Sequence, residues 1–442
     1  MKKVYIKDLS KLDYAELYCW VADKRKFKNQ IFLDLYDSTG ELQAIGIKDE
    51  TKNYSELTKI TKESAILVKG DIKKEKDKAI EFVIKDFDVI ALATLKLSPS
   101  PNEKKFDSLD KKYGRLVIER PTLYMRNKKL RSIYIIKSLY KKEMQDYFFK
   151  KDFMQFEAPT LTKQTLYKDS GAVWLNVEHQ DVTLSRCATF HLEPALIGQE
   201  RIFTITNSHA DEKVRTKRHL VEYLHLKAEM CWVDLDELID FAGKMYYQIS
   251  KRCYEKNKDL FHVVVPENII KEKLEKLNPK NHIHITYNEA VEILRKEYNI
   301  DFEYGKSISA RDEHILTKHF GEKFVWIKYI PYTVEGFMFK RNMDNRFLTQ
   351  TCDLIAPNGF GEILGCAEKF EDYDSLIQSM KEKDKFCDYD RYKDYCLLHK
   401  FGLPFHGGIG MGIERAIRYL IDVDHVKYIK PFAVVKGNKI NH

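Results

Sequence analysis

Four glycines that precede a short basic segment near the C-terminus form the strongest candidate for a ligand site. Gly407, Gly408, Gly410 and Gly412 lie within six positions, where the backbone can approach another group closely or adopt a positive φ. Apolar residues then recur at helical spacing, which places Arg415 in the first turn of a helix. Unpaired N–H groups at a helix start and a guanidinium both bind phosphate oxygens, so the segment favours a polyphosphate. A glycine-rich turn before an ordinary surface helix would give the same pattern, since neither G-x-G-x-x-G nor a Walker motif is present.

Two further segments carry polar side chains with a plausible chemical purpose. In the β-like run 219–227, His219 and Tyr223 share one face with three other residues, and such a face suits a nucleotide base and its phosphates. Asp353 and Glu362 flank a Pro-Asn-Gly turn, so two carboxylates at adjacent strand ends could share Mg²⁺ with phosphate oxygens. A solvent-facing strand and two solvated carboxylates would look the same.

Residues 1–95 contain β-rich stretches separated by polar or glycine-bearing turns. A barrel of about five strands is the natural packing, and the oligonucleotide-binding (OB) fold is the commonest such barrel. Arg25, Phe32 and Gln43 fall on the expected strands. A cation, an aromatic plate and an amide are the groups that recognise unstacked RNA bases. A core phenylalanine with two exposed polar neighbours would give the same pattern.

The composition is that of an ordinary soluble chain of two or three domains. Of its 442 residues, 44% are hydrophobic, and the net charge of +8 permits nucleic-acid binding without requiring it. Its 8 cysteines include no C-x-x-C pair, so we expect reduced thiols in a cytoplasmic protein. The start of the chain lacks a signal-peptide core, and no run of about 18 apolar residues occurs, so no membrane partner is expected.

Two Ser-Pro pairs and many charges indicate a linker at residues 96–112, followed by a larger domain at 113–442. Near its start, apolar residues from Ile133 to Phe148 predict a helix with a broad apolar face. A strand is predicted in FMQFEAPTL, ending at Pro159. The apolar face of the helix could be core or a subunit interface.

In this order, the segments resemble the motifs of class II aminoacyl-tRNA synthetases, and within that class the asparaginyl and aspartyl enzymes. FEAPTL is similar to the first class motif, RTKRHLVEYLHLKAE to the second and GIGMGIER to the third, while DLIAPNGFGEILG resembles the strand pair before the third. The resemblance covers nearly the whole chain. It implies an α+β fold, with an N-terminal OB-fold β-barrel that binds the anticodon and a catalytic domain built on an antiparallel sheet flanked by helices. It also implies a homodimer formed through the helix and strand of the first motif.

The resemblance implies an activity and a set of site residues. The family joins an amino acid to ATP as an adenylate, with Mg²⁺ at the phosphates, and passes the acyl group to the terminal ribose of tRNA. By position, the catalytic residues are Arg415, Glu212 and His219. The ATP-binding residues are Tyr223, His219, Arg415, Glu362, Asp353 and Gly412, and the metal carboxylates are Asp353 and Glu362. The tRNA-binding residues are Arg25, Phe32 and Gln43.

Several positions depart from the family pattern. Ala210 stands where the family has an arginine that holds the α-phosphate and the reacting carboxylate, and loss of one such donor typically costs on the order of 10²–10³ in rate. Lys369 replaces the arginine that reads the amino-acid side chain, and Asp169 replaces a glutamate that holds the substrate ammonium. Glu193, after Leu192, is closer to the asparaginyl pattern. The expected amino-acid pocket is Asp169, Thr189, Glu193, Lys369 and Arg186.

The sequence therefore predicts an asparaginyl-tRNA synthetase-like ligase that uses ATP and Mg²⁺, with tRNA and asparagine or a related amino acid as partners. The altered pocket keeps two alternatives open. One is a paralogue that forms an adenylate of another acid or uses another acceptor. The other is a catalytically weak tRNA-binding or regulatory protein.

Overall fold

The computed structural model describes residues 3–74, 80–103, 105–165, 171–211 and 216–437. The chain forms two compact units, Met1–Lys129 and Leu130–His442, which are considered separately below. The segment predicted as a linker belongs to the first unit, where Ser100 Oγ donates a hydrogen bond of 3.2 Å to Glu63 Oε1. The domain boundaries at residues 95 and 112 stay a prediction.

The first unit contains a closed five-stranded barrel of strand order β1-β2-β3-β5-β4. Along β1, exposed and buried side chains alternate strictly through the first eight residues, because successive side chains of a strand point to opposite faces. The buried set fills the barrel with aliphatic side chains. The predicted OB-fold barrel is confirmed. Its strands are β1 Tyr14–Lys26, β2 Gln30–Tyr36, β3 Glu41–Ile47, β4 Ala65–Lys73 and β5 Glu81–Ala91, with the short helices α1 Tyr54–Leu57, α2 Gly114–Glu119 and α3 Pro121–Tyr124 in the same unit.

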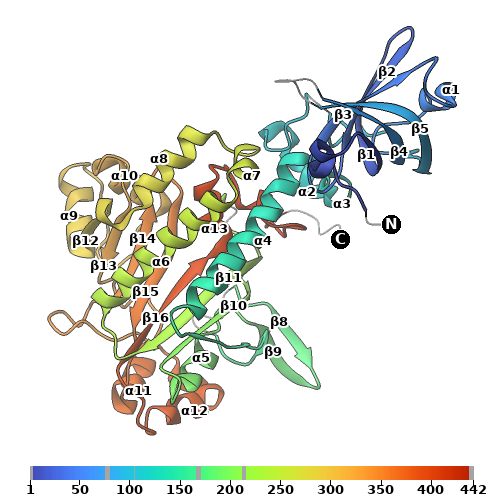
Figure 1. Cartoon of the computed structure of the whole chain (residues 1–442). Coiled ribbons are helices and arrows are strands. Elements are labelled where there is room, and N and C mark those ends of the chain that lie inside the picture. Colours follow the sequence, from blue (N-terminus) through green and yellow to red (C-terminus); the bar gives the residue numbers. More distant parts are fainter. Residues whose placement is uncertain (1–2, 75–79, 104, 166–170, 212–215, 438–442) are drawn as a thin grey trace. The chain divides into compact units, whose positions relative to one another are not determined.

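The second unit is built on an eight-stranded sheet of order β12-β13-β14-β15-β16-β11-β10-β6 (Figure 1). Its central pairs, from β13 to β10, are antiparallel, and only the outermost pairs are parallel. The strands are β6 Met154–Gln155, β10 Arg201–His209, β11 Glu222–Cys231, β12 Ile283–Thr286, β13 Val325–Lys328, β14 Thr351–Ala356, β15 Gly361–Glu368 and β16 His406–Gly412. A small second sheet consists of β7 Leu161–Thr162, β9 Gln180–Leu184 and β8 Trp174–Val177.

Helices pack on the large sheet and complete the predicted α+β architecture. Figure 1 shows α4 (Lys128–Phe149) and α6 (Leu235–Lys256) running side by side across it, and Tyr140 and Ser250 join them through a hydrogen bond of 3.1 Å. A capping box at Asp234 and Glu237 fixes the start of α6. The other helices are α5 Thr189–Leu196, α7 Lys258–His262, α8 Glu267–Leu277, α9 Tyr287–Lys296, α10 Ala310–His319, α11 Tyr373–Glu382, α12 Tyr389–Leu398 and α13 Ile413–Leu420. Short 3₁₀ helices lie at Ile6–Lys11, Lys111–Tyr113, Pro279–Asn281, Phe386–Asp388 and Val426–Tyr428.

The apolar face of α4 is buried within the chain itself. This face has no exposed surface at Ile133, Ile136, Tyr140 and Met144. It is therefore part of the core. Ile135 stays exposed on the same helix. Across the described ranges, every helix is too short or too polar to cross a bilayer.

The prediction of a strand in FMQFEAPTL was wrong for most of this segment. Only Met154–Gln155 pairs, with β10, and Phe156 N adds one hydrogen bond of 2.8 Å to Phe203 O. Pro159 has no N–H to donate, so the ladder does not continue to it.

Candidate active site

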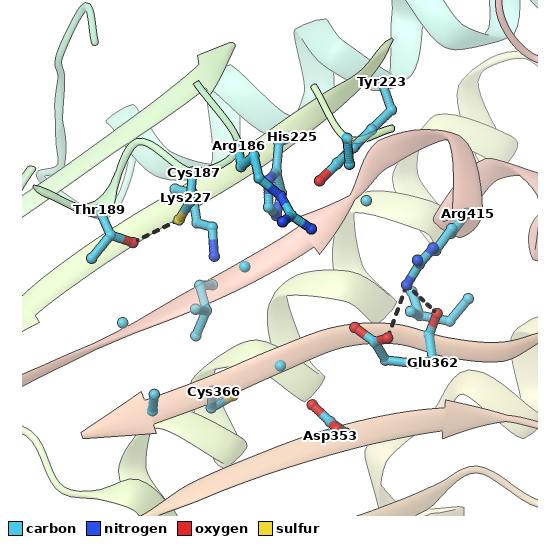
Figure 2. Close-up of a pocket in the computed structure, with 18 of the residues that line it drawn as sticks. Arg186, Cys187, Thr189, Tyr223, His225, Lys227, Asp353, Glu362, Cys366 and Arg415 are labelled. Carbon is cyan, nitrogen blue, oxygen red and sulfur yellow. Dashed lines mark hydrogen bonds and ion pairs between the residues drawn. The ribbon is translucent and has the colours of Figure 1, made fainter. Parts of the chain in front are cut away.

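A cavity of about 260 Å³ lies over strands β11, β14, β15 and β16 of the large sheet. Its lining includes Tyr223 and Arg415 at one end and Lys369 at the other. Figure 2 shows Arg186, His225 and Lys227 between Tyr223 on one side and Cys187 and Thr189 on the other. Residues that the sequence singled out in three distant segments therefore line the same cavity, namely His219, Tyr223, Asp353, Glu362 and Arg415.

The glycine-rich segment is a strand, not a turn, and its glycines make room for charged side chains. In β16, Gly408 pairs with Glu229 of β11 and Gly410 pairs with Lys227. A Cβ at Gly408 would overlap the Glu229 carboxylate, and a Cβ at Gly410 would overlap Lys227 Nζ. None of the glycines of this strand has a positive φ. Close approach, and not an unusual backbone conformation, is therefore what these positions require.

Arg415 lies on the first turn of α13, as the helical spacing predicted, and its guanidinium is held in place. Its Nη1 donates to Glu362 Oε2 at 3.0 Å, and its Nε donates to the carbonyl of Arg218 at 3.2 Å (Figure 2). Burial opposes the charge, but the carboxylates of Glu362 and Glu313 outweigh it and raise the pKa of Arg415. Gly412 caps the helix and also lines the cavity. The guanidinium thus stays charged and has a defined orientation.

Asp353 lies at the centre of a group of carboxylates. Burial and then the charges of Glu362, Glu335 and Glu313 raise the pKa of Asp353 well above its ordinary value. Burial likewise raises the pKa of Glu335 to about 7. A Cβ at Gly365 would lie 2.9 Å from Asp353 Oδ1, so the bare glycine leaves space beside this carboxylate.

Glu362 and Glu313 are paired with Arg415 and Arg218, whereas Asp353 and Glu335 form no ion pair with the described residues. Carboxylate oxygens of this kind fit a hard divalent ion such as Mg²⁺. Among the described residues, no three His, Cys, Asp or Glu side chains group as a ready-made metal cage. This is compatible with an ion held by two carboxylates together with substrate phosphates.

Aromatic and imidazole side chains line the end of the cavity near Arg415 in their neutral forms. Burial raises the pKa of Tyr223 to about 12. Burial, with help from Arg415 and Arg218, lowers the pKa of His219 to about 4, and Thr216 Oγ1 lies 2.6 Å from its Nδ1. Burial also lowers the pKa of His225 well below its ordinary value. At neutral pH these groups therefore offer stacking and hydrogen bonding without charge.

The opposite end of the cavity is a buried ionic cluster. Lys369 Nζ lies 2.8 Å from Glu193 Oε1 and 2.5 Å from Glu229 Oε1. Tyr395 donates a hydrogen bond of 2.8 Å to the other oxygen of Glu193, and His406 lies 3.5 Å from that oxygen. Burial opposes ionisation of Glu193, but Lys369 and His406 lower its pKa.

Glu229 differs from Glu193, because burial outweighs the attraction of Lys369 and raises the pKa of Glu229. Its Oε2 is buried without a hydrogen-bond partner within the described part of the chain. Lys369 is therefore held by two carboxylates, and Glu229 keeps one buried acceptor oxygen without a partner among the described residues.

The structure places the predicted amino-acid pocket only in part. Arg186, Thr189 and Lys369 line the cavity, and Ala210 lies on its wall after the end of β10. Glu193 does not line it but lies behind Lys369. Asp169 and Glu212 lie outside the described residues. Their predicted roles remain predictions.

The sequence placed Lys227 on the same face as Tyr223 and His225, and all three line the cavity. Sequence reasoning missed other lining residues. Glu229 continues the same alternation along β11, so the period-2 pattern could have found it. Glu335, which accepts a hydrogen bond of 3.2 Å from Thr351, follows no such pattern.

The three predicted tRNA-binding residues meet on the barrel through a fourth residue. Arg25 pairs directly with Phe32 across β1 and β2, and its guanidinium lies 5.8 Å from the ring centroid. Asp34 Oδ1 accepts hydrogen bonds from Arg25 at 2.8 Å and from Gln43 at 3.4 Å. Phe32 is half-buried, so it is not a core residue, and Phe27 packs edge-on against it at 5.5 Å.

Comparisons with known proteins agree with this architecture. The sequence profile of the tRNA synthetases class II (D, K and N) matches residues 115–436, and that of the OB-fold nucleic acid binding domain matches residues 17–90. The asparagine–tRNA ligase of Thermococcus kodakarensis is 26% identical over 422 residues, which are 95% of this chain and 94% of that protein. The enzyme of Pyrococcus abyssi is 26% identical over 442 residues, covering 98% of each chain.

Solved structures show the same similarity. The asparaginyl-tRNA synthetase of Pyrococcus horikoshii complexed with asparaginyl-adenylate superposes with a TM-score of 0.91 at 25% identity, covering 99% of each chain. The Entamoeba histolytica enzyme shares the fold, with a TM-score of 0.86 at 21% identity and 98% of each chain covered. The chain belongs to the class II tRNA synthetases of the D, K and N group, a family of aminoacyl-tRNA ligases, and carries an OB-fold domain of the anticodon-binding kind.

Proposed function

We propose that this protein forms an adenylate from ATP and asparagine or a related acid and transfers the acyl group to tRNA. The observation that carries the proposal is the cavity itself, which joins the Arg415–Glu362 pair at one end to the Lys369 cluster at the other. One end offers phosphate-binding groups and the other a selective polar pocket. This is the arrangement that an enzyme needs to join two substrates.

Strand β11 sets the scale of the site. Tyr223, His225, Lys227 and Glu229 alternate along one face, so Tyr223 and Glu229 are about 20 Å apart at 3.3 Å per residue. That length accommodates a nucleotide followed by an acyl group. Adenine would stack on Tyr223, the phosphates would lie near Arg415, and the end of the acid would reach Lys369.

In the reaction, an oxygen of the acid carboxylate attacks the α-phosphate and pyrophosphate leaves. Arg415 would hold the distal phosphate, and neutral His219 beside it can donate or accept a hydrogen bond without repelling Arg415. Asp353 and Glu362 would hold Mg²⁺, which supplies charge neutralisation at the phosphates when bound. Arg415, Glu362 and His219 are held by hydrogen bonds or an ion pair before substrate arrives, which is what electrostatic catalysis requires.

The arginine missing at Ala210 has a candidate replacement. Ser185 O accepts a hydrogen bond of 2.9 Å from His209 N, so the next residues, Arg186 and Ala210, begin side by side. Both line the cavity. Arg186 would supply the guanidinium for the α-phosphate from a neighbouring segment.

A second candidate function is activation of an acid other than asparagine. It is favoured by Lys369, which has an ammonium in place of a guanidinium fork and is already paired with two carboxylates. Further proposals that follow from the family are a homodimer formed through α4 and a cytoplasmic location. The free state of all eight cysteines suits that location.

Pyrophosphate exchange measured with ATP and each amino acid in turn tests the adenylation, and acylation of total tRNA with the accepted acid tests the transfer. Exchange with at least one acid is expected. If no acid supports exchange at any Mg²⁺ concentration, the chain does not form adenylates and the proposal fails.

Asp353→Asn and Glu362→Gln are each expected to raise the Mg²⁺ concentration needed for half-maximal exchange severalfold, because each variant removes one anionic oxygen ligand. A Mg²⁺ titration of exchange activity measures the effect. Glu297→Gln, which changes an exposed carboxylate that does not line the cavity, is the control. If the titration curves of both site variants coincide with the wild-type curve, Asp353 and Glu362 do not bind Mg²⁺ and have only a structural role.

Phe32→Ala is expected to weaken tRNA binding by about 1–3 kcal/mol, which is roughly a five-fold to hundred-fold loss of affinity, because it removes one stacking platform for a base. A filter-binding or fluorescence titration with total tRNA measures the effect. Tyr14→Ala removes an exposed aromatic from the far end of β1 and serves as the control. Equal affinities of wild type and Phe32→Ala would show that the barrel reads no base through this ring.

A further inference from the structure

Three charged side chains that line the cavity have no ion pair with the described residues, namely Lys227, Asp353 and Glu335. The other carboxylates and most cations of the lining are paired. The pairs are Arg415 with Glu362, Arg218 with Glu313, Lys369 with Glu229, and Glu414 with Lys137. Arg186 already has a proposed role at the α-phosphate. The charge that a substrate meets in the middle of the cavity therefore depends on the first three side chains.

Lys227 and Asp353 extend toward each other across two glycines. In the sheet, Asp353 lies opposite Gly365, Gly365 lies opposite Gly410, and Gly410 lies opposite Lys227. A Cβ at Gly365 would lie 2.9 Å from Asp353 Oδ1, and a Cβ at Gly410 would overlap Lys227 Nζ. Figure 2 shows the two side chains on opposite sides of β15 and β16. The ammonium of one and the carboxylate of the other therefore offset each other across the floor of the cavity.

Glu335 is the carboxylate that remains without a matching cation in the cavity. It accepts a hydrogen bond of 3.2 Å from Thr351 Oγ1. The charge of Lys383 also favours its ionised form, but Lys383 does not line the cavity, and its Nζ donates to the carbonyl of Tyr332. Burial, together with the charge of Glu362, outweighs these partners and raises the pKa of Glu335 to about 7. A cation brought by a substrate would stabilise the ionised carboxylate.

The hydrogen bond from Thr351 gives the level of Glu335 along the cavity. Thr351 is two residues from Asp353 along β14, about 7 Å, and lies opposite Ala367 of β15. Ala367 is two residues before Lys369. Glu335 therefore stands between the carboxylate proposed for Mg²⁺ and the far end of the acid. In the proposed binding mode, the carbon that bears the amino group lies at this level.

We propose that Glu335 binds the α-ammonium group of the amino acid that this site activates. The inference rests on the proposed adenylation and names the side of the cavity that receives the ammonium. On the β11 side, the ammonium would meet the like charge of Lys227, which a partly buried site penalises. On the β14 side, Asp353 is assigned to Mg²⁺, and Glu335 offers a charge-assisted hydrogen bond.

Calorimetric titration in the presence of Mg²⁺ and a non-hydrolysable ATP analogue measures what the α-ammonium contributes to binding. Three amino acids are each compared with the acid that lacks only this group: L-asparagine with succinamate, L-aspartate with succinate, and L-lysine with 6-aminohexanoate. In the pair whose amino acid binds most tightly, the amino acid is expected to bind about ten-fold tighter than its partner or more, as for one charge-assisted hydrogen bond. Equal dissociation constants, or no binding by any of the three amino acids, would overturn the proposal.

Substitutions of Glu335 assign this difference to its carboxylate. Glu335→Gln keeps the shape but not the charge, so it is expected to weaken binding of the amino acid by about ten-fold and to leave binding of its partner nearly unchanged. Glu335→Asp keeps the charge on a shorter side chain and should recover part of the loss. Glu297→Gln, which changes an exposed carboxylate that does not line the cavity, is the control. Both acids of a pair bind the same protein sample, so partial unfolding of a variant does not change the ratio of their dissociation constants.

Three results with these variants would contradict the proposal. The first is a ratio that stays unchanged in Glu335→Gln but is lost in Asp169→Asn, since the resemblance assigns the same ammonium to Asp169. The second is an equal loss of affinity for L-lysine and 6-aminohexanoate in Glu335→Gln, which would mean that Glu335 binds a side-chain ammonium. The third is an unchanged ratio together with a higher Mg²⁺ requirement for binding of the ATP analogue, which would make Glu335 a metal ligand.

Pyrophosphate exchange with the same amino acids separates this inference from the proposed function. If no acid supports exchange, adenylation fails, but the ratio of dissociation constants still decides the role of Glu335. If exchange occurs and the ratio is the same in wild type and Glu335→Gln, the proposed function stands and this inference fails.

Discussion

Arg415→Ala is expected to raise the activation free energy of ATP-dependent adenylation by about 2–4 kcal/mol, because it removes the charged donor that is proposed to bind the phosphates in the cavity. The loss should be visible in kcat/KM for ATP in pyrophosphate exchange and in the dissociation constant of ATP. Arg415→Lys keeps the charge without the fork and should recover only part of the loss. The fixed orientation explains the size of the effect, since Glu362 and the Arg218 carbonyl hold the guanidinium before ATP arrives.

Two controls keep this result specific. Arg346→Ala removes an exposed arginine of the same unit that does not line the cavity, and it should leave exchange unchanged. A thermal melt of Arg415→Ala checks that the buried Glu362, now without its partner, has not unfolded the site. If ATP affinity and turnover both match wild type in a folded Arg415→Ala protein, Arg415 does not bind the nucleotide.

The barrel and the α+β class could be predicted because their signals are local. Alternating apolar positions set each barrel strand, and the face of β11 that lines the cavity shows the same period. The start of α13 after Gly412 could also be read from the change of period. By contrast, the strand formed by the glycines before it could not be predicted, because glycine has a low strand propensity. Its β conformation depends on the neighbouring β11 and β15.

The contacts that define the site could not be predicted, because they join distant segments. Lys369, Glu193 and Glu229 come from the end of β15, from α5 and from β11, and no spacing in the sequence connects them. Asp34 was missed on the barrel for the same reason, since its role depends on strand register with Gln43. Sequence reasoning found the residue types of the site but not which charges cancel.

Lys369→Met is expected to destabilise the protein by about 3–5 kcal/mol, because removal of one partner from a buried ionic cluster leaves uncompensated charge. The cation and both carboxylates are at most 2% exposed, so water cannot replace it. Urea denaturation followed by tryptophan fluorescence measures the effect, and Trp174, Trp232 and Trp326 report on this unit. Lys244→Met, which breaks an exposed pair with Asp240, should change stability by about 0.5 kcal/mol or less.

The destabilisation of Lys369→Met should depend on pH in a defined direction. Without the ammonium, Glu193 and Glu229 lie buried together, and at least one carboxyl pKa rises above the unfolded value. Glu229 is expected to be the carboxyl group whose pKa rises more, since burial already raises its pKa in the wild type. The folded state then binds a proton that the unfolded state lacks, so stability falls as pH rises from the unfolded pKa, near 4.5, toward the raised folded value. The difference in the free energy of unfolding between Lys369→Met and wild type should therefore be smaller at pH 5.5 than at pH 7.5.

A second substitution assigns this pH dependence to the cluster. In Lys369→Met with Glu229→Gln, one carboxylate is replaced by a neutral amide, so Glu193 no longer shares the site with a second negative charge. The double variant should regain part of the lost stability, and its gap to wild type should vary less between the two pH values than that of Lys369→Met. A gap for Lys369→Met that is equal at both pH values would mean that neither glutamate takes up a proton. The destabilisation would then come from packing around the shorter side chain, and Lys369 would not be the ion that keeps two carboxylates charged at the end of the substrate cavity.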